Sequence, residues 1–363
     1  MKQTVLHQSH LQASSKMTDV QGWQVPLQFS DVQDEYHAVR AFAGLFDISY
    51  LGRIEVSGAG ATALLQKILT RNTSKMAVGS AHYSLICNEG GFILADVLVF
   101  LVSNGSPHRR FLLTTNAGNT EKILHWLKKH AADDVRIADV TQALALLALQ
   151  GPRSFNIIEN ISGHLFRKMK RGALREVTLS DVSVLISRTG YTGEHGYELF
   201  VPAERAQQVW ETILKAGKEG GLLPCGFTCR DMLRLEMGYL LYGNDIDETR
   251  TPLEAGLTSF VDFKKDFIGK EALLKIETAG VKQKIAGFIL VDKGIPKSGG
   301  SIFSENREIG VVTSGGHSPH LRTGIGIGYV ISRYAQPGQE IEIEVRDKEI
   351  AAKTVDLPFY RKK

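Results

Sequence analysis

Two segments of the chain combine glycine with side chains that can bind or react. Residues 188–198, RTGYTGEHGYE, place Gly190, Gly193 and Gly196 at intervals of three among two tyrosines and two glutamates. Glycine at this density lets the backbone turn tightly and lets a ligand approach the main chain closely. Residues 224–236, PCGFTCRDMLRLE, open a helix that carries Arg, Asp, Arg and Glu. Both segments are hard to explain as scaffold alone.

A single carboxylate stands in an apolar surrounding. Asp96 lies within the strand-like run Phe92–Val102, where the neighbouring side chains are almost all apolar. An aspartate in this setting must be hydrogen-bonded, lie at the rim of a sheet or have a function, because an unpaired buried charge is costly. On composition alone, a rim aspartate that caps a turn is the simpler interpretation.

Other familiar motifs are incomplete. Residues 58–63 fit the pattern GxGxxA after a strand, but the acidic residue expected about 20 positions later is missing. His317 and His320 form the closest histidine pair, and no third metal ligand suggests itself. The three cysteines are odd in number and lack zinc-site spacing, which favours a reducing cytosol over a disulfide framework. We therefore expect no dinucleotide, metal or flavin site.

Length and composition exclude several classes of protein. The chain has 363 residues, which predicts two or three packed units. Its hydrophobic content of 43% and net charge of +4 exclude a disordered protein. The longest apolar run, Ala143–Leu149, has seven residues, whereas a bilayer crossing needs about 20. Because there is also no signal peptide and no long basic block, we expect a cytoplasmic protein without membrane or nucleic-acid partners.

Hydrophobic periodicity predicts the elements that must position these residues. Residues 53–140 read as β-α-β-β-β-α-β, a compact α+β unit. Beyond residue 284, five short strands joined by Gly, Pro, Ser and Asn predict an antiparallel barrel or sandwich. The helices that we expect are Ala61–Thr70, Thr120–Ala132, Arg153–Asn160, Glu204–Lys218 and Thr228–Met237.

Several motifs together resemble the aminomethyltransferase family, the T-protein of the glycine cleavage system. The two segments above are the most specific, and the resemblance spans roughly residues 20–360. The shorter matches are Gln21-Gly22-Trp23 with Pro26, AGLFDIS at 43–49, LALQGP at 147–152, TSG at 313–315 and LPFY at 357–360.

The resemblance implies an α+β fold, a three-domain cloverleaf around a central folate site. Its first domain would be discontinuous, with residues 1–52 and 141–280. A ferredoxin-like α+β domain, residues 53–140, would be inserted into it, and an antiparallel β-barrel, residues 281–363, would follow.

The resemblance also implies an enzyme of glycine catabolism and one-carbon metabolism. The expected reaction moves the methylene carbon of an aminomethyl-lipoyl group to tetrahydrofolate. It releases ammonia and gives 5,10-methylenetetrahydrofolate. Tetrahydrofolate would be the acceptor substrate, with no metal and no flavin. The expected partner is the lipoylated H-protein, which carries the aminomethyl group.

Seven residues match positions to which the family assigns a role. Asp96 would accept the proton of folate N10 as that nitrogen attacks carbon. Glu198 would accept hydrogen bonds from the pterin 2-amino group and N3, and Arg230 would stand near the same ligand as a fixed cation. The remaining folate-binding candidates are Tyr191, Asn116, Tyr239 and Tyr83.

Each of these positions also has an ordinary structural interpretation. Asn116 could belong to a helix N-cap, and Arg230 could form a salt bridge with Asp231 or Glu236 on its own helix. Glu198 could be an exposed strand residue. The tyrosines could simply belong to a hydrophobic core.

Departures from the family pattern leave the donor and the carrier open. Tyr50 stands where the family usually has His, and Arg71 interrupts the usual TNDV motif. One alternative is a tetrahydrofolate-dependent demethylase on the same scaffold. Another is a non-enzymatic folate-binding factor that supports iron–sulfur proteins. The cysteine-centred KGCYxGQE signature of those factors is absent from the turn at 190–194.

Overall fold

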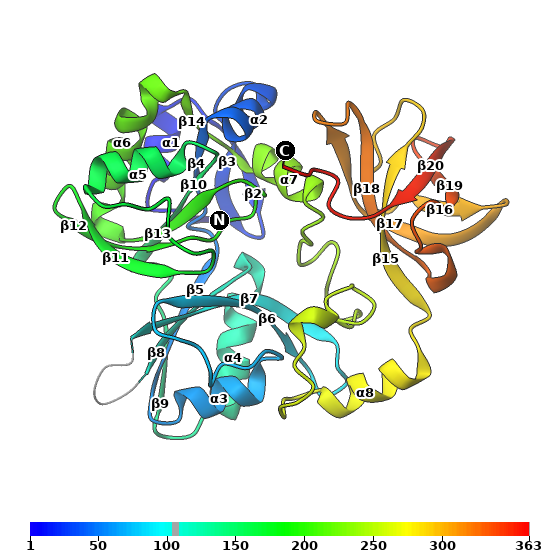
Figure 1. Ribbon diagram of the computed structural model, residues 1–363, viewed down its shortest axis with the longest axis horizontal. Helices are drawn as coiled ribbons and strands as arrows, with labels where there is room; N and C mark the ends of the chain where they lie inside the picture. The colour runs from blue at the N-terminus through cyan, green and yellow to red at the C-terminus, as the bar shows by residue number, and fades with distance from the viewer. Residues whose placement is uncertain (104–108, 363) are drawn as a thin grey trace. The chain divides into compact units, whose positions relative to one another are not determined.

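The computed structural model describes residues 1–103 and 109–362. The chain divides into two compact units, one formed by Met1–Ser84 with Ala95–Arg230 and the other by Leu85–Leu94 with Asp231–Lys363. Both units contain helices and strands (Figure 1), which confirms the expected α+β class. No helix in the described ranges is long and apolar enough to cross a membrane.

The first unit contains a six-stranded sheet of order β11-β12-β13-β10-β4-β14. Side chains alternate between the faces of a strand, so Ala145, Leu147 and Leu149 of β10 enter one core. Helices α5 and α6 cover that face (Figure 1) with Ile158, Trp210 and other buried side chains. The elements are α2 (Val32–Ala41), β4 (Ala43–Asp47), β10 (Leu144–Gln150), α5 (Ser154–Ser162), β11 (Leu174–Leu179), β12 (Val182–Ser187), β13 (Gly196–Pro202), η2 (Ala203–Arg205), α6 (Ala206–Gly217), η3 (Lys218–Gly220) and β14 (Leu222–Pro224).

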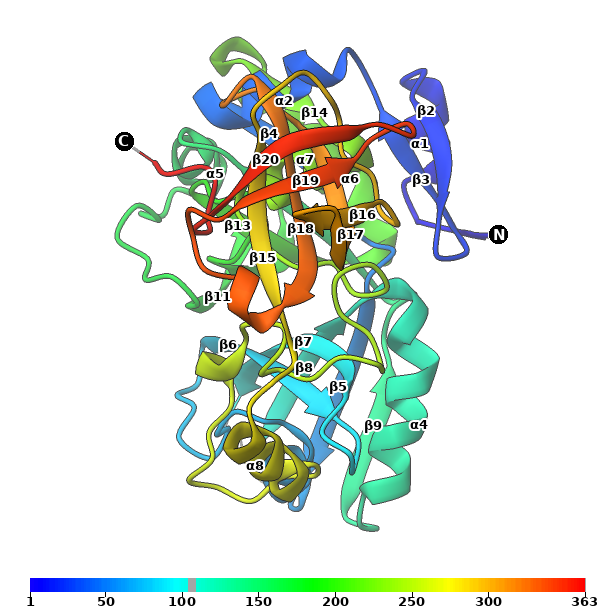
Figure 2. The same ribbon diagram turned by 90° about the vertical axis from the view of Figure 1, so that its right-hand side faces the viewer.

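A second sheet, of order β6-β7-β8-β5-β9, is formed by the chain between β4 and β10. Numbered along the chain, β5, β7, β8 and β9 lie in the order 2-3-1-4 of a ferredoxin-like sheet, with β6 added outside β7. Helix α4 runs alongside β9 (Figure 2) and buries Ile123 and Leu127. The elements are β5 (Gly52–Gly58), α3 (Ala61–Ile68), β6 (Ser80–Cys87), β7 (Ile93–Ser103), β8 (Arg110–Thr115), η1 (Ala117–Asn119), α4 (Thr120–His130) and β9 (Val135–Asp139).

The N-terminal segment forms a small sheet of order β1-β3-β2 with one short helix. Asp47, at the end of β4, fixes this segment. Its Oδ2 accepts a hydrogen bond from the Thr4 hydroxyl at 2.7 Å and lies 2.8 Å from His10 Nε2. The elements are β1 (Lys2–Gln3), α1 (His7–Gln12), β2 (Lys16–Val20) and β3 (Trp23–Gln28).

The second unit contains a closed barrel of order β15-β18-β17-β16-β19-β20, with antiparallel pairing throughout. This confirms the barrel rather than the sandwich. Phe288, Ile302 and Ile343 are among its buried core residues. The remaining elements are α7 (Phe227–Glu236), η4 (Thr258–Phe260), α8 (Lys270–Ala279), β15 (Gln283–Leu290), β16 (Ser301–Ser304), β17 (Arg307–Ser318), β18 (Thr323–Ile331), η5 (Ser332–Tyr334), β19 (Glu340–Glu344) and β20 (Glu349–Val355).

Candidate active site

Asp96 and Glu198 lie on sheet faces of the first unit that oppose each other. Alternation along β7 places Asp96 on the same face as Phe100, and alternation along β13 places Glu198 on the same face as Phe200. The two phenylalanine rings meet edge to face, with centroids 5.1 Å apart. The charge of Arg230 acts on both carboxylates. Both carboxylates therefore lie on faces that meet at this ring contact and within electrostatic range of the same cation.

Asp96 is held by two side-chain donors. The Asn116 amide donates to Oδ1 at 2.7 Å, and the Tyr83 hydroxyl donates to Oδ2 at 3.2 Å. Burial raises the pKa of the Asp96 carboxyl, and these donors, its own backbone N–H and the charge of Arg230 offset only part of that rise. A carboxylate with a raised pKa is a stronger base than an exposed aspartate.

Asn116 and Tyr83 are thereby placed beside Asp96, and their contact with folate stays a prediction. Asn116 is the N-cap residue of the short helix η1, which confirms that interpretation of its position, but its side chain makes no capping bond and instead binds Asp96. Burial, together with the nearby charge of Asp96, raises the pKa of the Tyr83 hydroxyl well above its usual value. That hydroxyl therefore keeps its proton and remains a donor to Asp96.

Glu198 is buried, with 6% of its surface exposed, so its interpretation as an exposed strand residue is wrong. The Thr189 hydroxyl donates to Oε2 of Glu198 and lies 2.9 Å from the Ser187 hydroxyl. Burial raises the pKa of Glu198, whereas the Thr189 bond and the charge of Arg230 act in the opposite direction. Thr189 was not among the candidates, although its place directly before Gly190 in the glycine-rich segment could have indicated it.

Arg230 contacts an aromatic ring rather than a neighbouring acid. Its guanidinium carbon lies 4.5 Å from the centroid of the Tyr191 ring, a cation–π contact. The Asp231 carboxylate instead accepts a hydrogen bond from Arg234 Nε at 2.7 Å. Glu236 accepts one from the Ser318 hydroxyl at 2.5 Å. The salt-bridge interpretation of Arg230 is therefore wrong.

Six of the seven candidates belong to the first unit, and Tyr239 belongs to the second. The backbone of Tyr239 is bound twice to Arg234. Its N–H donates to the Arg234 carbonyl at 3.0 Å, and its carbonyl accepts from Nη1 at 3.0 Å. The role of the half-buried Tyr239 side chain stays a prediction.

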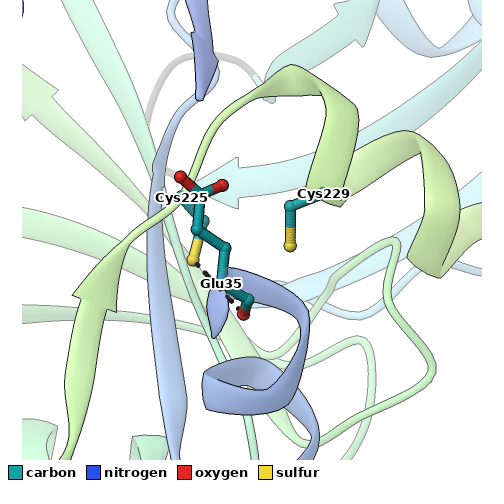
Figure 3. A group of neighbouring side chains, drawn as sticks. All are labelled: Glu35, Cys225 and Cys229. Carbon is teal, nitrogen blue, oxygen red and sulfur yellow. Dashed lines mark hydrogen bonds between the residues drawn. The ribbon is translucent and has the colours of Figure 1, made fainter. Parts of the chain in front are cut away.

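Another buried carboxylate, Glu35, lies beside Cys225 and Cys229 (Figure 3), and their ligand-capable atoms are all within 4.8 Å of one another. The Glu35 carboxylate already accepts three backbone N–H bonds, from Phe29 at 2.6 Å, Ser30 at 3.0 Å and Gly226 at 2.8 Å. Burial raises the pKa of the Cys225 thiol well above its usual value, whereas a metal needs the thiolate.

The Glu35 contacts suit a residue that stabilises the fold. Glu35 joins α2 to the start of α7, the helix that carries Arg230. We expect Glu35→Gln to lower the free energy of unfolding by about 1–3 kcal/mol, because one amide oxygen cannot accept all three N–H groups and a buried donor is left unsatisfied. Chemical denaturation would measure the change, with the exposed Glu176→Gln as control. Equal stability of the two variants would show that the Glu35 hydrogen bonds between α2 and the start of α7 do not stabilise the fold.

Comparison with known proteins identifies the family. Residues 6–265 match the GCVT N-terminal domain family, and residues 283–361 match the glycine cleavage T-protein C-terminal barrel domain family. An aminomethyltransferase of Halothermothrix orenii is 43% identical over 360 residues, which cover 99% of this chain and 100% of that protein. One of Caldanaerobacter subterraneus is 42% identical over 365 residues, which cover 100% and 96%.

A solved structure agrees with these relatives. The glycine cleavage system aminomethyltransferase T from Bartonella henselae superposes with a TM-score of 0.91 and is 32% identical, covering 99% of this chain and 98% of that one. The chain belongs to the glycine cleavage T-protein family, which confirms the resemblance. It is an enzyme of the transferase class, an aminomethyltransferase, and the known reaction of its family is tetrahydrofolate-dependent aminomethyl transfer.

Proposed function

We propose that Asp96, Glu198 and Arg230 form the tetrahydrofolate site of this aminomethyltransferase and that its donor is the aminomethyl-lipoyl group of an H-protein. The observation that carries the proposal is that the sheet faces carrying Asp96 and Glu198 meet at the Phe100–Phe200 contact and that one cation, Arg230, is near enough to both carboxylates to affect them. Two carboxylates and a fixed cation suit a ligand that offers paired N–H donors at one end and a proton to be removed at the other.

Glu198 would bind the pterin end of the folate. An ionised carboxylate accepts the 2-amino and N3 hydrogens in parallel, a bidentate arrangement that fixes the plane of the ring. Tyr191, held under the Arg230 guanidinium, supplies an aromatic wall next to that plane. Arg230 also favours the ionised form of Glu198, which this recognition requires.

Asp96 would act on the reacting nitrogen. As N10 of tetrahydrofolate forms its bond to the methylene carbon, the bond from that carbon to the amino nitrogen would break, and the N10 proton would pass through an Asp96 oxygen to the departing amine, which leaves as ammonia. The positive charge that develops at the carbon is stabilised by the same carboxylate. Asn116 and Tyr83 orient the two oxygens, so the proton acceptor is in place before the substrate arrives.

The Asn116 contact gives a prediction about pH. Its hydrogen bond lowers the pKa of Asp96, so Asn116→Ala should raise that pKa further. A general base acts in its deprotonated form, and the acidic limb of the kcat profile should therefore shift to higher pH. Single-turnover rates across the acidic range would measure the shift. An unmoved limb would show that the Asp96 carboxylate does not limit the rate there.

The partner and the compartment are also part of the proposal. The family acts within the glycine cleavage system, and a lipoylated H-protein is the carrier that its chemistry requires. The three cysteines are free and buried, which suits a reducing compartment, and we place the enzyme in the cytoplasm.

Turnover with defined donors tests the proposal. We expect 5,10-methylenetetrahydrofolate and ammonia when the enzyme is given tetrahydrofolate and aminomethyl-lipoyl H-protein. A parallel reaction replaces the H-protein with small methylated sulfur, oxygen or nitrogen donors. Turnover only in the second reaction would show a demethylase, and folate binding without turnover in either would show a binding factor.

A further inference from the structure

A buried amide lies on the same sheet face as Glu198. Gln150 is the last residue of β10 and is 1% exposed. In the antiparallel register, Ala148 pairs with Glu198 and Gln150 pairs with Gly196. Because side chains alternate, Gln150 and Glu198 point to the same side of the sheet, opposite the core under α5 and α6.

The Gln150 side chain binds the glycine-rich turn at several points. Its Nε2 donates to the backbone carbonyl oxygens of Thr189 at 3.2 Å and Tyr197 at 3.4 Å. Its Oε1 accepts from the Thr192 hydroxyl at 3.0 Å. The amide therefore uses both its donor and its acceptor function to hold the start, the middle and the end of the turn.

Two glycines of the turn leave room for this amide. A Cβ added to Gly190 would lie 2.1 Å from Gln150 Oε1, and one added to Gly196 would lie 2.3 Å from the same oxygen. Real Cβ atoms do not approach other atoms so closely. The glycine spacing seen in the sequence is therefore explained, at these two positions, by the amide that the turn encloses rather than by the approach of a ligand.

The enclosed turn carries the residues that complete the site. Thr189 donates to Glu198, and Tyr191 lies under Arg230. We propose that Gln150 is a positioning residue for folate binding, which acts by fixing Thr189 and Tyr191 relative to Glu198. This inference rests on the proposed role of Glu198 and Tyr191, but Gln150 itself is assigned no contact with the substrate.

Tetrahydrofolate titration of Gln150→Glu tests the inference. Glutamate keeps the shape but cannot donate to the two carbonyl oxygens, so the turn should loosen and the dissociation constant should rise about tenfold. The kcat at saturating folate should change far less, because Asp96 lies on another strand. The exposed Gln142→Glu, which makes the same chemical change just before β10, is the matched control.

A double-mutant cycle separates positioning from general stability. If Gln150 acts through Tyr191, Gln150→Glu should weaken binding much less in a Tyr191→Ala background than in the wild type. An equal loss in the wild type, in this background and in a Thr189→Val background would overturn the inference. Gly190→Ala, which places a methyl group where the amide lies, should reproduce the weakened binding, and it serves as the test if Gln150→Glu does not fold.

The two proposals fail in different ways. A wild-type enzyme that binds no tetrahydrofolate, or a Glu198→Gln variant with unchanged affinity, would defeat the proposed site itself. Wild-type binding that is weakened by Glu198→Gln but unaffected by both Gln150→Glu and Gly190→Ala would overturn the Gln150 inference alone.

Discussion

Asp96→Asn is expected to abolish most of the catalytic rate while it leaves the fold and most of the tetrahydrofolate affinity intact. Asparagine has the same shape, and its oxygen can still accept the Asn116 amide, which lies 2.7 Å away in the wild type. It cannot accept the N10 proton, and loss of a positioned general base costs about 10²–10⁴ in rate. The loss should appear in kcat, because proton transfer belongs to the transition state.

Thermal unfolding of the same Asp96→Asn preparation should show no loss of stability. The pKa of Asp96 is raised in the folded protein, so the folded state binds the proton more tightly than the unfolded state does. The contribution of this group to stability is therefore present at low pH and is lost as pH rises through the raised pKa. At neutral pH a neutral amide removes the cost of a buried charge, and the melting temperature should be unchanged or higher.

Glu55→Gln is the control for Asp96→Asn, because it removes a carboxylate from the same sheet, at β5. It should leave the rate unchanged. A rate for Asp96→Asn within about threefold of the wild type would fall far short of the loss expected for a general base and would remove Asp96 from the mechanism. A lower melting temperature together with near-normal turnover would show that Asp96 is a structural residue.

Elements with strong local periodicity could be predicted from the sequence. The expected strand Arg110–Thr115 has the observed bounds of β8, and the expected helix Thr120–Ala132 matches α4 to within two residues. Their apolar side chains repeat with the period of the element, so the pattern is visible without tertiary contacts. The same periodicity predicts the short strands beyond residue 284, but it leaves a barrel and a sandwich open, and the barrel follows only from the family resemblance.

Elements that depend on tertiary contacts were missed. The short α1 is mostly polar in sequence, yet it buries His7 and His10, and His10 is paired with Asp47, 37 positions away. The barrel strand Ser301–Ser304 has four residues, too few for an alternating pattern to stand out. The division into domains at 1–52 with 141–280, 53–140 and 281–363 stays a prediction.

The arrangement of the candidate site also depends on tertiary contacts and could not be predicted from the sequence. Its residue types followed from the family motifs, but no local pattern could show that Phe100 meets Phe200 or that the faces carrying Asp96 and Glu198 oppose each other. Those contacts join strands about 100 positions apart and depend on the register of two sheets. Gln150 was visible only as part of the LALQGP motif, because a buried amide and a surface glutamine look alike in a sequence.

Glu198→Gln should give the opposite pattern to Asp96→Asn. Glutamine keeps the length and can still accept from Thr189, but it offers the pterin one acceptor oxygen and an amide that faces N–H donors. Loss of a charged bidentate contact should weaken tetrahydrofolate binding by about 1.5–3 kcal/mol, which is roughly a 10- to 150-fold rise in the dissociation constant. Titration calorimetry would measure it, with the exposed Glu176→Gln on the same sheet as control.

The pH dependence of wild-type binding provides a second readout for Glu198. Burial raises the pKa of this carboxyl, so it is protonated at a higher pH than an exposed glutamate is, and binding should weaken as pH falls through that range. The Glu198→Gln variant has no such group and should lose this part of the pH dependence. If its affinity equals that of the wild type at every pH, Glu198 serves only to hold Thr189, and the pterin must be recognised elsewhere.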